Sequence, residues 1–406
     1  MRPLAGSSSV WSWKGQRPLT GWRAMIAPRV PWLNLDFSVI LLAALLVGTS
    51  LVFVERMQES DEAFGREGVR FALHVKKLLV ALPFLFVGFF LRPRWLRKRA
   101  WALYGLALLL LCLVPIVGEE RNHARSWIAL PFGFDLQPSE LAKVGLILAL
   151  ARALYRNRLE QGRDWFLPAL VALLPMLLVA AQPDLGTALT IVPVTLGMLW
   201  VAGGSGRLLL GLVGAGLFLG LLAWRGEWVH GYQKKRIDVW ADCFAAETLI
   251  ENKNGAAFHA YQARVAIGNG GWFGTGLGRG VANEAGHLPE RESDSIFAVV
   301  AEELGFAGTV FFVVLYLSFS ALLFLAASRT RERFSRLLVS GVALYFAAHF
   351  FIHSGVNLGL LPMTGLTLPL VSTGGSSMLA SMLALGLALG LSARHEPALD
   401  FDAFRA

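Results

Sequence analysis

The chain of 406 residues is poor in charge and in cysteine. Only 16% of its residues are charged, against about 25% in a typical soluble domain, and 55% are hydrophobic. This shortage of charge excludes a soluble enzyme with a single anchor, because apolar runs long enough to span a bilayer recur along the chain. The two cysteines, Cys112 and Cys243, form neither a CxxC motif nor a metal-spaced pair, and their places in an apolar run and a polar loop argue against a disulfide.

The sequence also lacks a signal peptide, a repeat of fixed period and a soluble domain large enough to fold alone. Residues 1–35 are basic but have no clean apolar core followed by a cleavage site of small residues, so we expect a cytoplasmic N-terminal tail. The net charge of +9 is typical of Lys and Arg in cytoplasmic loops, and we expect no nucleic acid as a partner.

Apolar segments fill most of the chain, and about ten of them are predicted to cross a membrane as helices. They are residues 37–54, 78–91, 100–118, 137–155, 166–181, 185–206, 208–224, 296–328, 337–361 and 376–391. The predicted fold is an all-α polytopic membrane protein with its bundle in residues 36–394. A cytoplasmic C-terminal tail follows at 395–406, and one long extracellular loop, 225–295, joins the seventh and eighth helices.

Basic residues mark one side of the membrane. They are concentrated in the loops around 92–99, 152–163 and 329–336, which by the positive-inside rule lie in the cytoplasm together with both termini. The alternate loops, 119–138, 182–185, 225–295 and 362–375, are then external. These loops hold the unusual polar motifs, so we expect a reaction site on the outer face.

Two of the external motifs have a plain structural interpretation beside a functional one. Residues 137–143 begin a helix with Pro138 in its first turn, and Glu140 and Lys143 are spaced to pair on one face. Ionisable groups at membrane depth are often functional, which is the competing interpretation. Asp184 lies in a Gln-Pro-Asp-Leu-Gly turn, where a helix cap is the interpretation that the local residues favour.

The long loop offers basic residues and glycines. Its basic run at 232–236 is typical of a solvated face or a headgroup contact, and it would also suit a diphosphate. The glycine-rich stretch 266–280 permits positive φ and could present N–H groups to phosphate oxygens, with a flexible loop as the alternative. A dinucleotide site is excluded, because no βαβ context surrounds these glycines.

The last two motifs lie where polar loops enter helices. Asp294 ends the run Leu288–Asp294, and desolvation there would raise its pKa toward that of a general base, whereas a helix cap is the ordinary alternative. Residues 374–377, Gly-Gly-Ser-Ser, fit either an anion-binding helix N-terminus or a capped start with small residues. His349 and His353 are four residues apart without the Glu of a zincin motif, so we expect polar contacts inside the bundle.

In their order and spacing these motifs resemble the SEDS family, the RodA/FtsW polymerases of bacterial peptidoglycan. The matching stretches are 125–127, 137–143, 182–186, 266–280, 288–297 with 302–306, and 368–377. The resemblance implies a ten-helix peptidoglycan glycosyltransferase of the cytoplasmic (inner) membrane that faces outward. It would join lipid II into β-1,4 glycan strands, inverting the anomeric centre and releasing undecaprenyl diphosphate. The implied partners are a class B penicillin-binding protein as transpeptidase, the undecaprenyl-linked glycan and membrane lipids.

The resemblance places the family's essential aspartate on Asp294, which would take the proton from the acceptor 4-hydroxyl. Cationic groups would offset charge on the diphosphate, and a divalent cation, Mg²⁺ or Mn²⁺, would share that task, although no ligand set is legible. The candidate substrate-binding residues are Arg125, Glu140, Lys143, Asp184, Arg236, Gln262, Arg264, Arg279, Glu290, Ser376 and Ser377. Four positions depart from the usual family pattern, namely Ser126, Ala263, Ser295 and Thr373. The short tails favour the RodA branch, and so cell elongation over division.

Two other functions remain as alternatives. A lipid II flippase would need no chemistry, but a transporter should show a polar path near the bilayer midplane, whereas here the polar residues crowd the outer rim. A scaffold that only recruits the transpeptidase would tolerate loss of the Asp294 carboxylate.

Overall fold

The computed structural model describes residues 36–65, 68–121, 124–130, 134–182, 184–226, 258–281 and 288–394, together with residues 234, 237–238 and 240–241. The predicted tails at 1–35 and 395–406 lie outside these ranges, as does much of the predicted loop 225–295.

Each of the ten predicted spans overlaps with one helix of the described chain. These are α1 (Phe37–Ala63), α2 (Phe71–Phe90), α3 (Pro93–Val117), α4 (Pro138–Leu154), α5 (Phe166–Ala181), α6 (Leu185–Val201), α7 (Gly206–Arg225), α12 (Ile296–Arg329), α13 (Arg333–Asn357) and α14 (Gly375–Ser392). Seven helical segments are long and apolar enough to cross a membrane, while α6 and α7 carry shorter apolar runs. The chain is therefore an all-α polytopic, multi-pass membrane protein, and the number of its crossings stays a prediction.

Helix ends differ most from expectation where charged residues continue a helix beyond its apolar part. Helices α2 and α3 each begin seven residues before the predicted span, and α1 continues to Ala63 instead of ending at residue 54. Helix α3 begins at Pro93, and its first two turns contain Arg94, Arg97, Lys98 and Arg99. The physical reason is that hydropathy marks hydrocarbon depth, whereas long basic side chains let a helix extend into the headgroup region.

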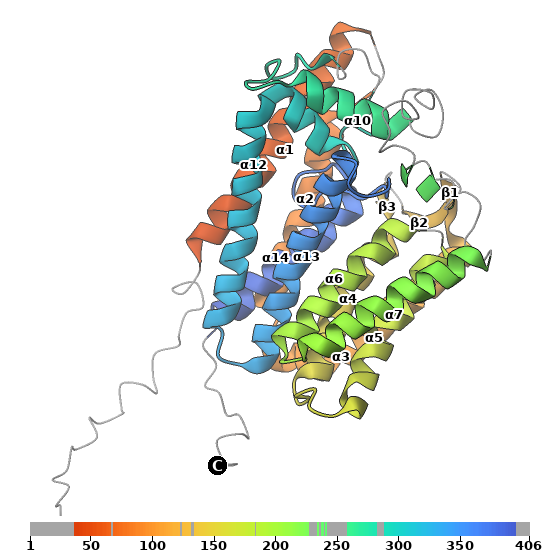
Figure 1. The fold of residues 1–406 in the computed structure, drawn as a ribbon. Coiled ribbons are helices and arrows are strands. Elements are labelled where there is room, and N and C mark those ends of the chain that lie inside the picture. Colours follow the sequence, from red (N-terminus) through yellow and green to blue (C-terminus); the bar gives the residue numbers. More distant parts are fainter. Residues whose placement is uncertain are drawn as a thin grey trace, which may run out of the picture.

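Short elements occupy the external loops. An antiparallel sheet of order β1-β2-β3 is formed by β1 (Glu119–Arg121), β2 (Ala124–Leu130) and β3 (Phe134–Leu136). These strands lie in the segment 119–138, which was predicted to be an external loop. Helix α10 (Phe258–Asn269) lies within the predicted loop 225–295, and a 3-10 turn, η3 (Gly162–Trp165), precedes α5. The three strands, α10 and the start of α12 lie at one end of the bundle (Figure 1).

The glycine-rich stretch packs onto a kink in α12. Gly305 interrupts that helix with φ 68° and ψ −170°, a conformation that favours glycine. A Cβ at Gly305 would clash with the backbone of Gly274, and a Cβ at Gly274 would clash with Glu303 O. The two segments therefore meet backbone to backbone.

Helices α2 and α14 also approach closely through small residues. A Cβ on Gly386 would clash with Leu85 O, one on Gly390 with Phe89 O, and one on Gly88 with Leu383 O. Small residues spaced four apart are the usual means by which membrane helices bring their backbones together. This pairing fixes α2 against the most buried helix of the bundle.

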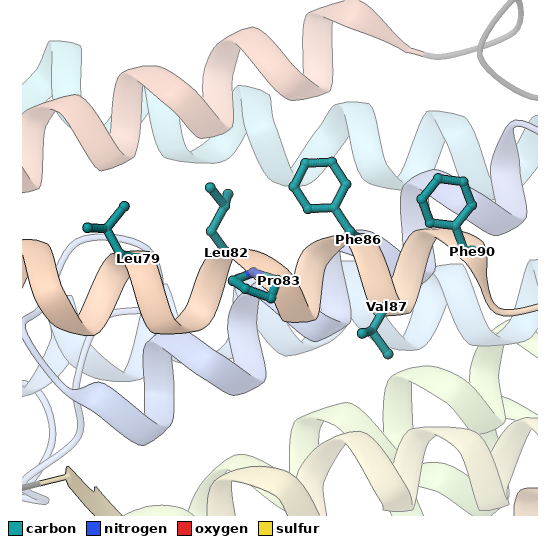
Figure 2. A pocket seen from close by; sticks show the side chains of 6 residues that line it. All are labelled: Leu79, Leu82, Pro83, Phe86, Val87 and Phe90. Atoms are coloured by element: carbon teal, nitrogen blue, oxygen red, sulfur yellow. The ribbon is translucent and has the colours of Figure 1, made fainter. Parts of the chain in front are cut away.

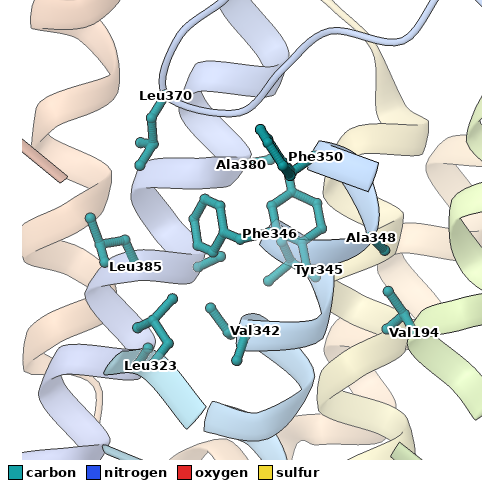
Figure 3. Packing of buried hydrophobic residues seen from close by; sticks show 14 of the residues in the cluster. Val194, Leu323, Val342, Tyr345, Phe346, Ala348, Phe350, Leu370, Ala380 and Leu385 are labelled. Atoms are coloured by element: carbon teal, nitrogen blue, oxygen red, sulfur yellow. The ribbon is translucent and has the colours of Figure 1, made fainter. Parts of the chain in front are cut away.

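Helices α13 and α14 form the centre of the core. Tyr345, Phe346 and Phe350 of α13 pack among Leu323 of α12 and Leu385 of α14 (Figure 3). By contrast, α2 presents an apolar groove lined by Leu79, Leu82, Pro83, Phe86, Val87 and Phe90 (Figure 2). Its exposed apolar lining is what a helix presents to lipid.

Candidate active site

Asp294 lies on a tight turn immediately before α12. The N–H groups of Ser293, Asp294 and Ser295 all donate to Glu290 O, at 3.0, 2.9 and 3.2 Å, and Glu290 has a positive φ of 44°. The N-cap position of α12 belongs to Ser295 and not to Asp294. The capping alternative for Asp294 is therefore wrong, and a strained backbone of this kind is typical of functional sites.

The segment that precedes α14 packs against this turn. Ser372 Oγ donates to Ser293 O at 2.6 Å, and Thr373 N donates to Glu292 O at 2.9 Å. Gly365, with φ 69°, is so close that a Cβ there would lie 3.4 Å from Asp294 Oδ2. The motif Leu288–Asp294 and the segment before α14, separate in the sequence, therefore meet at one carboxylate.

Two further contacts hold the turn from other helices. Arg291 forms a buried ion pair with Asp61, near the end of α1, and Asp61 also accepts the N–H of Val69 at 3.0 Å. Asn357, the last residue of α13, donates through Nδ2 to Asp294 O at 3.0 Å. The turn is thus fixed to α1 on one side and to α13 on the other.

Glu292 is a second carboxyl group on the same turn. Burial raises its pKa above the usual range, and Glu290 adds to that shift, while its own backbone hydrogen bond, Arg291 and Lys77 oppose it. Its neighbour Lys77, on α2, donates to Thr373 O at 3.0 Å. Glu292 was absent from the sequence-based candidates, although it belongs to the same motif as Asp294.

Glu140 and Lys143 form the ion pair that their spacing predicted. Lys143 Nζ lies 2.8 Å from Glu140 Oε1, and both side chains are buried. Lys143 Nζ also lies 2.7 Å from His349 Nε2. Because His349 Nδ1 is 2.8 Å from Tyr345 O, which can only accept, Nδ1 carries the hydrogen and Nε2 accepts from Lys143. His353 similarly donates from Nδ1 to Leu366 O.

Several buried polar atoms around this pair lack a hydrogen-bond partner among the described residues. They include Glu140 Oε2 and Ser139 Oγ. Buried polar groups are nearly always paired with protein or with ordered water. This region is therefore suited to take water or a polar ligand.

Comparison with known proteins assigns the family. The model of the FtsW/RodA/SpoVE family, described as cell cycle proteins, matches residues 35–396. The chain belongs to this family. It is 33% identical over 394 residues to the probable peptidoglycan glycosyltransferase FtsW of Mycobacterium bovis, covering 95% of this chain and 70% of the relative. It is 36% identical over 355 residues to the corresponding protein of Aromatoleum aromaticum, covering 83% of this chain and 82% of the relative.

Solved structures of the SEDS family agree with this assignment. The RodA crystal structure from Thermus thermophilus is 33% identical, with a TM-score of 0.66, and 90% of this chain matches 99% of that one. A chain from a peptidoglycan synthase complex that coordinates polymerization and crosslinking is 32% identical, with a TM-score of 0.75, over 90% of this chain and all of that one. The resemblance to the SEDS family is confirmed. Because the similar proteins include both FtsW and RodA, the preference for the RodA branch stays a prediction.

Two predicted SEDS site residues, Asp184 and Ser376, make hydrogen bonds that join separate segments of this chain. Asp184 is the N-cap of α6, where it accepts Thr187 N at 3.1 Å and Gln137 Nε2 at 3.1 Å. Ser376 Oγ donates to Asp135 O at 2.6 Å and accepts from Gln137 N at 2.8 Å. Asp184 is thus the cap that its local sequence favoured.

Three N–H groups of the glycine-rich SEDS motif donate hydrogen bonds to α12. Thr275 N donates to Glu302 O, Gly276 N donates to Glu303 O, and Gly278 N donates to a carboxylate oxygen of Glu303. A phosphate nest would need these groups to face a ligand. These three N–H groups are therefore used within the protein, and this part of the loop packs against α12. Phosphate binding by other N–H groups of the stretch stays a prediction.

The other predicted residues are spread over the outer end. Arg264 of α10 donates to Gly359 O at 3.3 Å, Gln262 is half-buried on the same helix, and Arg279 is exposed. Glu290 begins the turn that carries Asp294. The backbone of Arg125 lies in β2, whereas its side chain, like all of Arg236, is outside the described part.

Proposed function

We propose that the chain is an inverting peptidoglycan glycosyltransferase that polymerises lipid II on the outer face of the cytoplasmic membrane. Relatives aligned over most of their length bear the name peptidoglycan glycosyltransferase, which supports this reaction class. The observation that carries the residue assignment is the turn of Asp294, which is held by α1, α13 and the segment before α14. A carboxylate carried on a backbone held in this way, at a loop end of a bundle, is suited to act as a general base.

The reaction follows from this arrangement. The acceptor sugar's 4-hydroxyl attacks the anomeric carbon of the donor as its proton passes to Asp294, and the bond from that carbon to the diphosphate oxygen breaks. Undecaprenyl diphosphate leaves with the electron pair, and the anomeric centre inverts. General-base assistance of this kind contributes roughly 10²–10⁴ in rate. Lys143, Arg264 and Arg279 are the described candidates for offsetting charge on the leaving group.

A divalent cation and a partner belong to the same proposal. Among the described residues, no group of three His, Cys, Asp or Glu side chains is placed to hold a metal ion. Mg²⁺ at phosphate sites is usually held by only one or two carboxylates together with substrate phosphates, so the divalent cation stays a proposal, and the steps above use protein groups alone. The likeness to a chain from a peptidoglycan synthase complex supports a class B penicillin-binding protein as the transpeptidase partner.

The test is polymerisation of lipid II by the purified chain, reconstituted with and without that partner. Asp294→Ala and Asp294→Asn should reduce glycan formation at least 100-fold, because the proton acceptor is lost. A matched control is Glu160→Gln, since Glu160 is an exposed carboxylate in the loop between α4 and α5. That variant should polymerise at the wild-type rate.

Two results would contradict the proposal. Wild-type activity in both Asp294 variants would remove Asp294 as the base. Transbilayer movement of lipid II by the wild type without any glycan product would favour the flippase.

A further inference from the structure

A polar cavity adjoins the turn of Asp294. It has a volume of about 220 Å³ and lies between the outer end of α2, the residues just before α2, and the contact of Glu292 with Thr373. The polar residues that line it are Arg70, His74, Lys77, Glu292 and Thr373. None of the proposed reaction steps uses this cavity.

The hydrogen bonds of His74 define what it presents to the cavity. Ser50 Oγ donates to Val371 O, so its one hydrogen is used. Ser50 Oγ must then accept from His74 Nε2, which is 2.9 Å away. In the neutral ring Nδ1 is consequently a hydrogen-bond acceptor. His74 is only 2% exposed, and Nδ1 has no partner among the described residues.

Lys77 presents the complementary group one turn further along α2. One hydrogen of its ammonium group goes to Thr373 O at 3.0 Å, which leaves two for other acceptors. The cavity therefore combines an unused acceptor, available donor hydrogens and the carboxyl group of Glu292.

We propose that this cavity is a sugar subsite, in which a hydroxyl group donates to His74 Nδ1 while a substrate oxygen accepts from Lys77. A hydroxyl is both donor and acceptor, whereas a phosphodiester oxygen has no hydrogen for Nδ1 and would face the Glu292 carboxyl. The volume is below the roughly 300–1,000 Å³ of drug-sized sites, so it suits one sugar ring of the glycan substrate. This assignment rests on the proposed function, and Glu292 places the sugar beside the turn of Asp294.

Two substitutions of His74 separate the subsite from a structural role. His74→Gln keeps a donor near the Nε2 position for Ser50 but removes the Nδ1 acceptor. His74→Asn keeps an acceptor near the Nδ1 position but loses the contact with Ser50. A subsite predicts weaker substrate binding in His74→Gln, whereas a merely structural histidine predicts the larger defect in His74→Asn.

The experiment measures equilibrium binding of lipid II and of undecaprenyl diphosphate to the full chain in detergent, together with the KM and kcat of polymerisation. We expect His74→Gln to weaken lipid II binding about 5- to 10-fold and to raise KM similarly, as loss of one buried hydrogen bond does. Its kcat and its affinity for undecaprenyl diphosphate, which has no sugar, should stay within about twofold. His74→Asn, which keeps an acceptor near the Nδ1 position, should weaken lipid II binding less than His74→Gln does, and the control Glu160→Gln should bind lipid II as the wild type does.

The outcomes that overturn the subsite differ from the one that overturns the proposed function. If the wild type neither binds nor polymerises lipid II, the function itself is wrong. If the wild type is active and His74→Gln binds lipid II normally, or binds it better than His74→Asn, only the subsite is wrong. Equal weakening toward lipid II and undecaprenyl diphosphate would assign the cavity to the diphosphate and refute the sugar.

Discussion

The ion pair of Asp61 and Arg291 allows a sharp test of how the site is held. The two side chains are 5% and 9% exposed and join the end of α1 to the turn that carries Asp294. Asp61→Asn removes the negative charge but keeps an oxygen for the N–H of Val69. The substitution therefore isolates the charge from the hydrogen bond.

The expected cost follows from burial. Removing one partner of a buried ion pair typically costs about 3–5 kcal/mol. The comparison is Glu59→Gln, which breaks the pair of Arg56 and Glu59 just before Asp61 on α1, where the side chains are 45% and 54% exposed. An exposed pair contributes only about 0–1 kcal/mol, so the two variants should differ by several kcal/mol in their free energy of unfolding.

The assay combines unfolding in detergent with single-turnover polymerisation of lipid II. Asp61→Asn should lower kcat roughly 10- to 100-fold, because displacement of a catalytic group by about 1 Å costs up to about 10² in rate. Glu59→Gln should leave both stability and rate near the wild type. If Asp61→Asn matched Glu59→Gln in both measurements, the pair would not position the turn.

Two further predictions concern packing and protonation. Gly386→Ala should destabilise the chain by about 1–3 kcal/mol, because its Cβ would clash with Leu85 O. Gly211→Ala on α7 has open space around it and should stabilise the chain by up to about 1 kcal/mol through helix propensity. Thermal unfolding measures the stability of both variants. Glu292 has a folded-state pKa above its usual 4.5, so the folded chain holds more protons than the unfolded chain between those two values, and this group's contribution to stability falls as pH rises. Glu292→Gln should therefore become more stable relative to the wild type as pH rises above about 4.5; a pH-independent difference would refute this.

The fold was largely predictable because hydropathy acts over single segments. The predicted span 166–181 coincides with α5, and 296–328 differs from α12 by one residue. The predicted spans missed polar helix extensions, such as α1 beyond residue 54, since those turns are helical without being apolar. They also missed the kink at Gly305, which depends on the docking of Gly274 from another segment.

The site was predictable only where one motif contains both its residues and their partners. The pairing of Glu140 with Lys143 follows from helical spacing, and the cap at Asp184 follows from its turn. By contrast, Asp61 and Asn357 hold the turn of Asp294 from distant parts of the chain. Such partners are set by tertiary packing, which no local pattern encodes.

The donor for the leaving diphosphate must then be sought among side chains. The N–H groups of Thr275, Gly276 and Gly278 in the described glycine-rich loop are directed to Glu302 and Glu303, so this part of the loop packs on the kink of α12. Lys143 differs from these backbone groups, because described residues account for two of its three ammonium hydrogens, through Glu140 and His349. It is buried beside an unpaired oxygen of Glu140, in a region where a ligand oxygen would be poorly screened by water. A fixed cation in that setting can stabilise developing charge without reorganising.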